Sequence, residues 1–212
     1  MAIISNGING GFSGKAGAVV GYYRFGKWVV RSLPKPSAKR KKGTPGQRAS
    51  RSVFNKMQYF LSPILDYIRM GFAQEAKTRQ MTAHNAAKSY NMRHAFSSDG
   101  EIVYSKVLIS MGQLVAPVNA NIVKSDTGFW ASWNDDTDHK TAFYDDRLIF
   151  LAYDVQNERA FGTRIGPARS EKEGGIVIPE SERGNTYHIW LAFVSDQRDK
   201  ISNSSYMGSF EF

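Results

Sequence analysis

The residues best suited to chemistry in this sequence form an acidic stretch, Asn134 to Asp138 (NDDTD), with oxygen ligands at alternate positions. A calcium loop has that spacing, and Asp145 stands at the position of its twelfth ligand. However, His139 replaces the glycine that such a loop needs, and Asp145 replaces the bidentate glutamate. We therefore expect a solvated loop between strands, with no metal and no cofactor.

Neither the histidines nor the acidic pairs form a catalytic pattern. The four histidines lie in unrelated contexts along the chain: His84, His94, His139 and His188. Asp135/Asp136 and Asp145/Asp146 lie among turn-forming residues, so we interpret both pairs as turn residues rather than buried carboxylates of raised pKa. The sequence also lacks cysteine and any Gly-x-Ser-x-Gly motif. We therefore predict that the protein is not an enzyme.

A phosphate-binding loop is suggested by Ser13-Gly14-Lys15, in the glycine-rich arm near the start of the sequence. That motif requires a glycine five residues before the Gly-Lys pair and a Ser or Thr directly after it. Asn9 and Ala16 occupy those two places. Because glycine permits close approach to another surface, we interpret the arm as an assembly contact instead.

Charge is divided unequally between the two halves of this 212-residue chain, whose net charge is +9. Residues 1–100 contain 17 basic and 3 acidic side chains, whereas residues 101–212 contain 11 and 16. Such asymmetry indicates one half that faces a polyanion and another that faces solvent or a partner. Two alternatives are that the halves dock on each other, or that the chain assembles with acidic proteins.

The densest positive charge lies in a proline-flanked linker, residues 34–43. Basic runs of this kind bind phosphate backbones by counterion release, without sequence preference. A solvated tether is the alternative interpretation. The residues that we predict to bind a polyanion are Lys35, Lys39, Arg40, Lys41, Lys42, Arg48 and Arg51.

Two β-rich runs, residues 18–23 and 28–33, flank a plausible turn at Arg24-Phe25-Gly26-Lys27 and predict a β-hairpin. A lone hairpin is marginally stable, so it must pack on the helices, on the C-terminal module or on another subunit. Its aromatic side chains, flanked by cations, could alternatively stack nucleic-acid bases. The predicted assembly contacts are Gly14, Lys15, Gly17, Tyr22, Tyr23, Phe25 and Trp28.

Helix signals begin at Thr44, which suits an N-cap, followed by Pro45 at the first helical position and Gln47 at the third. Apolar residues then recur every three or four positions as far as Phe72, which predicts one helical face. Pro63 divides this stretch into two helices. Thr82 is predicted to cap a third.

After Glu101 the pattern changes to short strands separated by turns, as is typical of an antiparallel β-sandwich. We expect the nearly continuous apolar runs 147–154 and 186–195 to be central strands, and Trp133 to lie in the core. The other expected strands are 102–110, 121–124, 129–133, 159–165, 176–178 and 201–210. The predicted fold class is α+β, with an N-terminal β-hairpin, a helical segment and an immunoglobulin-like β-sandwich. The predicted parts are 1–33 (arm and hairpin), 34–43 (basic linker), 44–98 (helical segment) and 101–212 (sandwich).

Four segments carry a family resemblance: SGKAGAVVGYYRFGKWVVRSLP, TPGQRASRSVF, FLSPILDYIRMGF and ISNSSYMGSF. Together they resemble an uncharacterised family of proteins of about this length, widespread in Bacteroidota and their phages. The first 75 residues are also similar to phage structural proteins, which pair a Gly-Lys-x-Gly arm with a Thr-Pro-x-Gln helix ahead of an immunoglobulin-like module. This similarity implies a virion or assembly component.

Two hypotheses about function follow. The first is a structural protein of a phage-like assembly, in which protein subunits are the partners and the chain is a homo- or hetero-oligomer. The second is a standalone DNA- or RNA-binding protein without sequence preference. We expect a cytoplasmic or virion location, because the sequence starts without a secretory signal and no apolar run is long enough to span a membrane.

Overall fold

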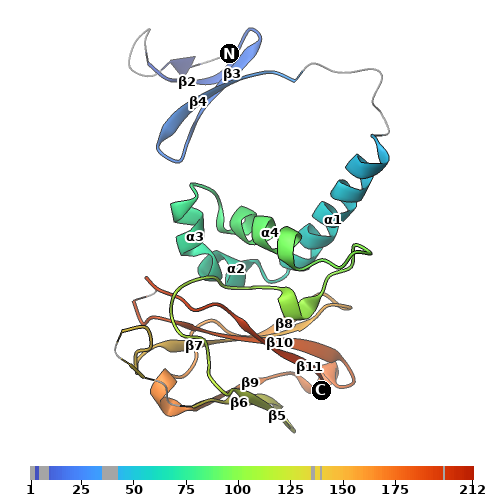
Figure 1. The fold of residues 1–212 in the computed structure, drawn as a ribbon, viewed down its shortest axis with the longest axis vertical. Coiled ribbons are helices and arrows are strands. Elements are labelled where there is room, and N and C mark those ends of the chain that lie inside the picture. The colour runs from blue at the N-terminus through green and yellow to red at the C-terminus, as the bar shows by residue number, and fades with distance from the viewer. Residues whose placement is uncertain (1–2, 5–9, 35–42, 135–136, 139, 198) are drawn as a thin grey trace. The chain divides into compact units, whose positions relative to one another are not determined.

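The computed structural model describes residues 3–4, 10–34, 43–134, 137–138, 140–197 and 199–212. The chain divides into two compact units, Met1–Gln47 and Arg48–Phe212 (Figure 1). Below they are called the N-terminal unit and the main unit. The fold is α+β, as predicted, with a hairpin-containing sheet first, then helices, then a strand-rich C-terminal half.

The N-terminal unit contains a four-stranded antiparallel sheet in the order β1-β2-β3-β4. The predicted hairpin is formed by β3 and β4, and its two turn residues, Phe25 and Gly26, have φ values of 48° and 79°. Positive φ at both positions is the type I′ geometry, which matches the twist of paired strands. The glycine-rich arm adds two strands that the sequence did not predict. The strands are β1 (Ile3–Ile4), β2 (Phe12–Ala16), β3 (Val19–Arg24) and β4 (Lys27–Ser32).

The predicted capping box at the first helix is confirmed. The backbone N–H of Gln47 donates to Thr44 Oγ1 at 3.3 Å, and the backbone N–H of Thr44 donates to Gln47 Oε1 at 3.0 Å. Thr82 caps the last helix by accepting a hydrogen bond from the N–H of Asn85 at 3.2 Å. The chain turns at Ser62-Pro63, as predicted, and a further short helix precedes Thr82. The helices are α1 (Pro45–Leu61), α2 (Leu65–Gly71), α3 (Ala73–Thr78) and α4 (Ala83–His94).

Two antiparallel sheets form a sandwich in the main unit, in the orders β5-β6-β9 and β11-β10-β7-β8. Trp133 is buried between them, with its ring edge-on to Phe193 at 5.5 Å between centroids, as predicted for the core tryptophan. The strands are β5 (Asn121–Ser125), β6 (Gly128–Ser132), β7 (Arg147–Asp154), β8 (Arg159–Thr163), β9 (Glu173–Val177), β10 (Thr186–Val194) and β11 (Ser205–Glu211). Short 3₁₀ turns are η1 (Tyr104–Lys106), η2 (Arg169–Glu171) and η3 (Glu180–Glu182).

The helices cover the outer face of the sheet that contains β7 and β10, which therefore has side chains buried on both faces (Figure 1). Leu151, Tyr153 and Trp190 point toward the helical layer, and Phe150 and Leu191 point toward the other sheet. Burial on both faces explains why these two strands are almost continuously apolar. The helical segment and the sandwich, predicted as separate parts, share this core within one compact unit.

The predicted strand over residues 102–110 is wrong. This segment contains η1 and lies against the helices, with its backbone groups bonded to side chains. The side chain of Asn91 accepts a hydrogen bond from the N–H of Leu108 and donates one to its carbonyl, both at 2.9 Å. Trp190 Nε1 donates to the carbonyl of Val107 at 3.1 Å. Because these side chains satisfy the backbone, the segment does not need a partner strand.

None of the described helices is long and apolar enough to cross a membrane.

Candidate interaction surfaces

Strand register sorts the side chains of the N-terminal sheet into two chemically different faces. Side chains alternate along a strand, and residues paired across strands share a face. Tyr23 pairs with Trp28, and Gly21 lies between Gly14 and Val30. One face is therefore apolar, and its larger residues are Phe12, Ala16, Val19, Tyr23, Trp28 and Val30. It is called the apolar face below.

The apolar face is exposed at its largest residues. The exposed fractions are 61% for Tyr23, 55% for Val30 and 42% for Trp28. The rings of Tyr23 and Trp28 meet edge-to-face, with centroids 5.2 Å apart. Trp28 also lies against Gly11, where a Cβ atom would come within 1.9 Å of the indole. Adjacent exposed apolar side chains of this size mark a surface for interaction.

The opposite face, called the basic face, carries Lys15, Arg24, Lys27 and Arg31 together with Val20, Tyr22 and Val29. Arg24 and Lys27 are direct cross-strand neighbours. Like charges in that position destabilise a strand pair. The guanidinium carbon of Arg31 lies 5.9 Å from the centre of the Tyr22 ring. This face therefore has the chemistry of an anion-binding surface.

The predicted assembly contacts are divided between these surfaces. Gly14, Tyr23 and Trp28 belong to the apolar face, and Lys15 and Tyr22 belong to the basic face. Turns hold the other two: Gly17, with φ of 58°, between β2 and β3, and Phe25 between β3 and β4. The alternation of side chains along the predicted strands could have separated the two faces from the sequence. It would also have placed Val30 on the apolar face.

Of the predicted polyanion-binding residues, Arg48 and Arg51 lie exposed in the first half of α1. The other five lie outside the described residues: Lys35, Lys39, Arg40, Lys41 and Lys42. Whether these cations act together is therefore still a prediction.

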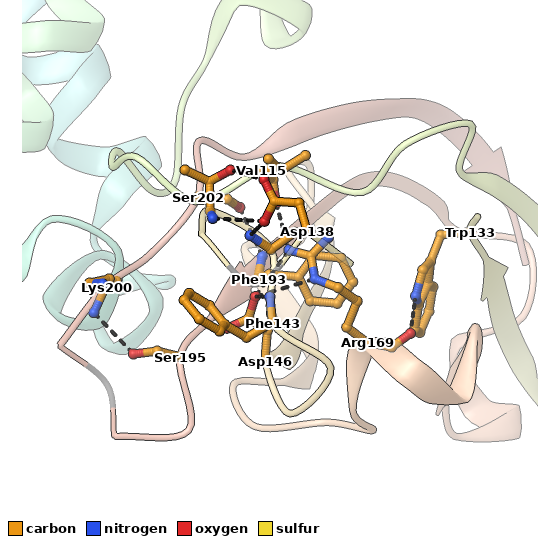
Figure 2. Close-up of polar contacts among 12 residues, drawn as sticks. Val115, Trp133, Asp138, Phe143, Asp146, Arg169, Phe193, Ser195, Lys200 and Ser202 are labelled. Atoms are coloured by element: carbon orange, nitrogen blue, oxygen red, sulfur yellow. Dashed lines mark hydrogen bonds and ion pairs between the residues drawn. The ribbon is translucent and has the colours of Figure 1, made fainter. Parts of the chain in front are cut away.

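Asp138, the last residue of the acidic stretch, closes a loop (Figure 2). Its carboxylate accepts hydrogen bonds from the backbone N–H groups of Lys140, Thr141 and Ala142 and from the Thr141 hydroxyl, at 2.7–2.9 Å. These donors hold the pKa of Asp138 well below its usual range. Asp135, Asp136 and His139 lie outside the described residues.

The prediction that Asp146 is merely a turn residue without a raised pKa is wrong. Its side chain is completely buried, and Oδ2 accepts hydrogen bonds from Arg169 at 3.2 Å and from the N–H of Phe143 at 3.0 Å (Figure 2). Oδ1 has no hydrogen-bond partner among the described residues. Burial raises the pKa of Asp146, while the Phe143 N–H and the Arg169 charge oppose the rise.

Arg169 is also buried and joins three parts of the sandwich. Its guanidinium donates to the carbonyl of Val115 at 2.8 Å and lies 3.9 Å from the centre of the Phe193 ring, and its own carbonyl accepts from Trp133 Nε1 (Figure 2). The arrangement fixes loops to the core, so we interpret it as structural. The sequence offered no signal for it, because Asp146 and Arg169 are 23 residues apart.

Comparison with curated proteins found no match to this sequence. A family model does match, over residues 11–208, and it therefore covers the chain from β2 into β11. The expectation of an uncharacterised family is thus confirmed, while its distribution among Bacteroidota and phages is still a prediction. Since the match covers most of the chain, this protein belongs to a family of unknown function (DUF6266).

Proposed function

We propose that this protein is a non-enzymatic structural component that joins subunits of an assembly, and that the assembly is a phage-like virion. The contact is the apolar face of the N-terminal sheet, and the partner is a neighbouring protein subunit. The exposure of Tyr23, Trp28 and Val30 side by side on one face is the observation that carries the proposal. The similarity of the first 75 residues to phage structural proteins suggests the setting.

Burial of this face would supply a strong driving force. Fully burying one large apolar side chain contributes about 1.5–3 kcal/mol, and several such residues lie together here. A small sheet with one uncovered apolar face also gains stability from a second layer. Because the contact is apolar, the assembly is expected to survive high salt.

The test is the mass of the full chain in solution, measured by light scattering after size-exclusion chromatography at high salt. Wild type is expected to form multimers, and Val30→Lys is expected to shift it to monomer because a charge enters the apolar face. Val177→Lys is the matched control, since Val177 is an exposed strand valine in the main unit. A wild-type chain that stays monomeric and does not co-purify with particles would contradict the proposal.

Nucleic-acid binding is the second candidate, and the basic face favours it. Four cations on one face, beside Tyr22, suit a phosphate backbone with bases stacked on an aromatic ring. In the main unit, Arg48 and Arg51 are further exposed cations that suit a phosphate backbone. The same setting, an assembly that packages nucleic acid, is compatible with both functions.

Fluorescence anisotropy with a labelled single-stranded oligonucleotide tests this candidate at two salt concentrations. Affinity is expected to fall steeply with salt. Arg24→Ser with Arg31→Ser removes two cations, so the slope of log affinity against log salt should become shallower by about 1.4 for a single strand. Val30→Lys should leave binding intact because it changes the opposite face. Absence of a complex at low salt would exclude this function.

A further inference from the structure

An aromatic-walled pocket of about 620 Å³ opens in the main unit, between α1, the segment that precedes η1 and the β7–β8 turn. Four rings line it: Tyr59, Phe60, Tyr104 and Tyr153. Phe60 packs edge-on against Tyr153, with ring centroids 5.3 Å apart, and Tyr104 lies 5.9 Å from Phe60. This volume is within the range of ligand-binding pockets.

Tyr153 is the polar group that suggests a ligand. The residue as a whole is only 1% exposed, yet it lines the pocket. Burial and the nearby charge of Glu158 raise the pKa of Tyr153 far above its usual value, so the hydroxyl stays protonated. The oxygen of a protonated tyrosine hydroxyl can accept a hydrogen bond from a bound donor such as an ammonium or guanidinium group.

Charges at the rim favour a cation. Lys56 Nζ already bonds to the Glu101 carboxylate and to the carbonyl of Gly100, so its charge is matched. Glu158, at the β7–β8 turn, forms no ion pair within the described part of the chain. The three charged residues leave a net charge of −1 beside four aromatic rings. Aromatic faces combined with a carboxylate are a recognition site for ammonium or guanidinium groups.

We propose that this pocket binds a Lys or Arg side chain from the basic stretch, residues 34–43, of a second copy of this chain. The stretch contains Lys35 and the run Lys39 to Lys42, the densest positive charge in the sequence. Glu158 forms an ion pair with the cation. The ring of Tyr59 lies against the cation, and the hydroxyl of Tyr153 accepts a hydrogen bond from it. The inference rests on the proposed assembly function, because neighbouring copies raise the effective concentration of a weak contact.

The direct test is anisotropy titration of a fluorescent peptide with the sequence of residues 34–43. The protein is the full chain with Lys39→Ser, Arg40→Ser, Lys41→Ser and Lys42→Ser, so that its own basic run does not compete. Glu158→Gln and Tyr59→Ala are each expected to weaken binding about tenfold. Glu173→Gln and Tyr144→Ala are the matched controls, since both residues are exposed and lie outside the pocket. No binding, or equal binding by all variants, overturns the inference.

Sedimentation of the unmodified chain at low salt separates this inference from the proposed function. If the second-copy contact forms, Glu158→Gln should lower the average mass of the chain in solution. If the chain forms multimers that Val30→Lys disrupts but Glu158→Gln leaves unchanged, the assembly function stands and the second-copy contact is overturned. If the peptide binds but the chain is monomeric at every concentration, the assembly function and the second-copy contact both fail.

Discussion

Two sheets of this molecule, the N-terminal sheet and the β11-β10-β7-β8 sheet, are built from similar side chains but are covered differently. Val30 on β4 is 55% exposed, whereas Leu151 on β7 is completely buried between the sheet and the helices. Both are aliphatic residues on antiparallel strands. The main unit supplies its own second and third layers, whereas Tyr23, Trp28 and Val30 on the apolar face are exposed.

The same contrast holds for charge. In the main unit the guanidinium of Arg169 is buried and bonded to the carboxylate of Asp146. On the N-terminal sheet, Arg24 and Lys27 are paired across strands with their charges on one face. The main unit therefore pairs its buried charges with each other, whereas the N-terminal sheet places like charges side by side.

The largest effect is expected from a substitution that removes one partner of the buried ion pair. Arg169→Met should reduce the free energy of unfolding by about 3–5 kcal/mol, because it leaves the Asp146 carboxylate buried and uncompensated. Urea denaturation followed by circular dichroism measures this. Arg183→Met is the control, because its ion pair with Glu180 is exposed, and the expected change is within about 1 kcal/mol. Equal effects of the two substitutions would show that the buried pair has no special role.

A pair of alanine substitutions tests the two sheets directly. Leu151→Ala should lower the free energy of unfolding by about 2–5 kcal/mol, because it opens a cavity between the sheet and the helices. Val30→Ala should change it by less than about 0.5 kcal/mol in dilute monomer, because the side chain is exposed. A large loss from Val30→Ala under those conditions would mean that the apolar face is already covered.

The smallest effect concerns pH. Burial lowers the pKa of His188, whose Nδ1 hydrogen-bonds to the Tyr206 hydroxyl at 2.8 Å, and burial also lowers the pKa of His84. The unfolded chain therefore binds more protons than the folded chain as pH falls below about 6.5. The free energy of unfolding should decrease in that window, and His188→Gln should make the decrease shallower. Denaturation at several pH values measures the slope, and an unchanged slope in the variant would assign it to His84 or to other groups.

Much of the fold follows from short-range patterns. Thr44, Pro45 and Gln47 predicted the capping box, and Phe25-Gly26 marked the hairpin turn. The apolar runs of β7 and β10 predicted central strands, because burial of both faces removes the usual polar alternation. Burial on both faces also requires a third layer, which the helices provide.

The candidate surfaces were predicted less completely. The aromatic residues of the hairpin were identified, but Phe12 was missed, and the division into an apolar and a basic face depends on strand register. The pocket beside α1 was missed, because Tyr59, Tyr104 and Tyr153 come from three separate segments and share no sequence pattern.

The sequence by itself determined the caps, the turns, the positions of most strands and the uneven distribution of charge. These depend on neighbouring residues and on composition. The tertiary structure alone decided that Asn91 and Trp190 would hold residues 107–108 out of a strand, that Asp146 would be buried against Arg169, and that Tyr153 would line a pocket. Each of these depends on side chains far apart in the chain, whose approach is set by how the layers pack and not by any local preference.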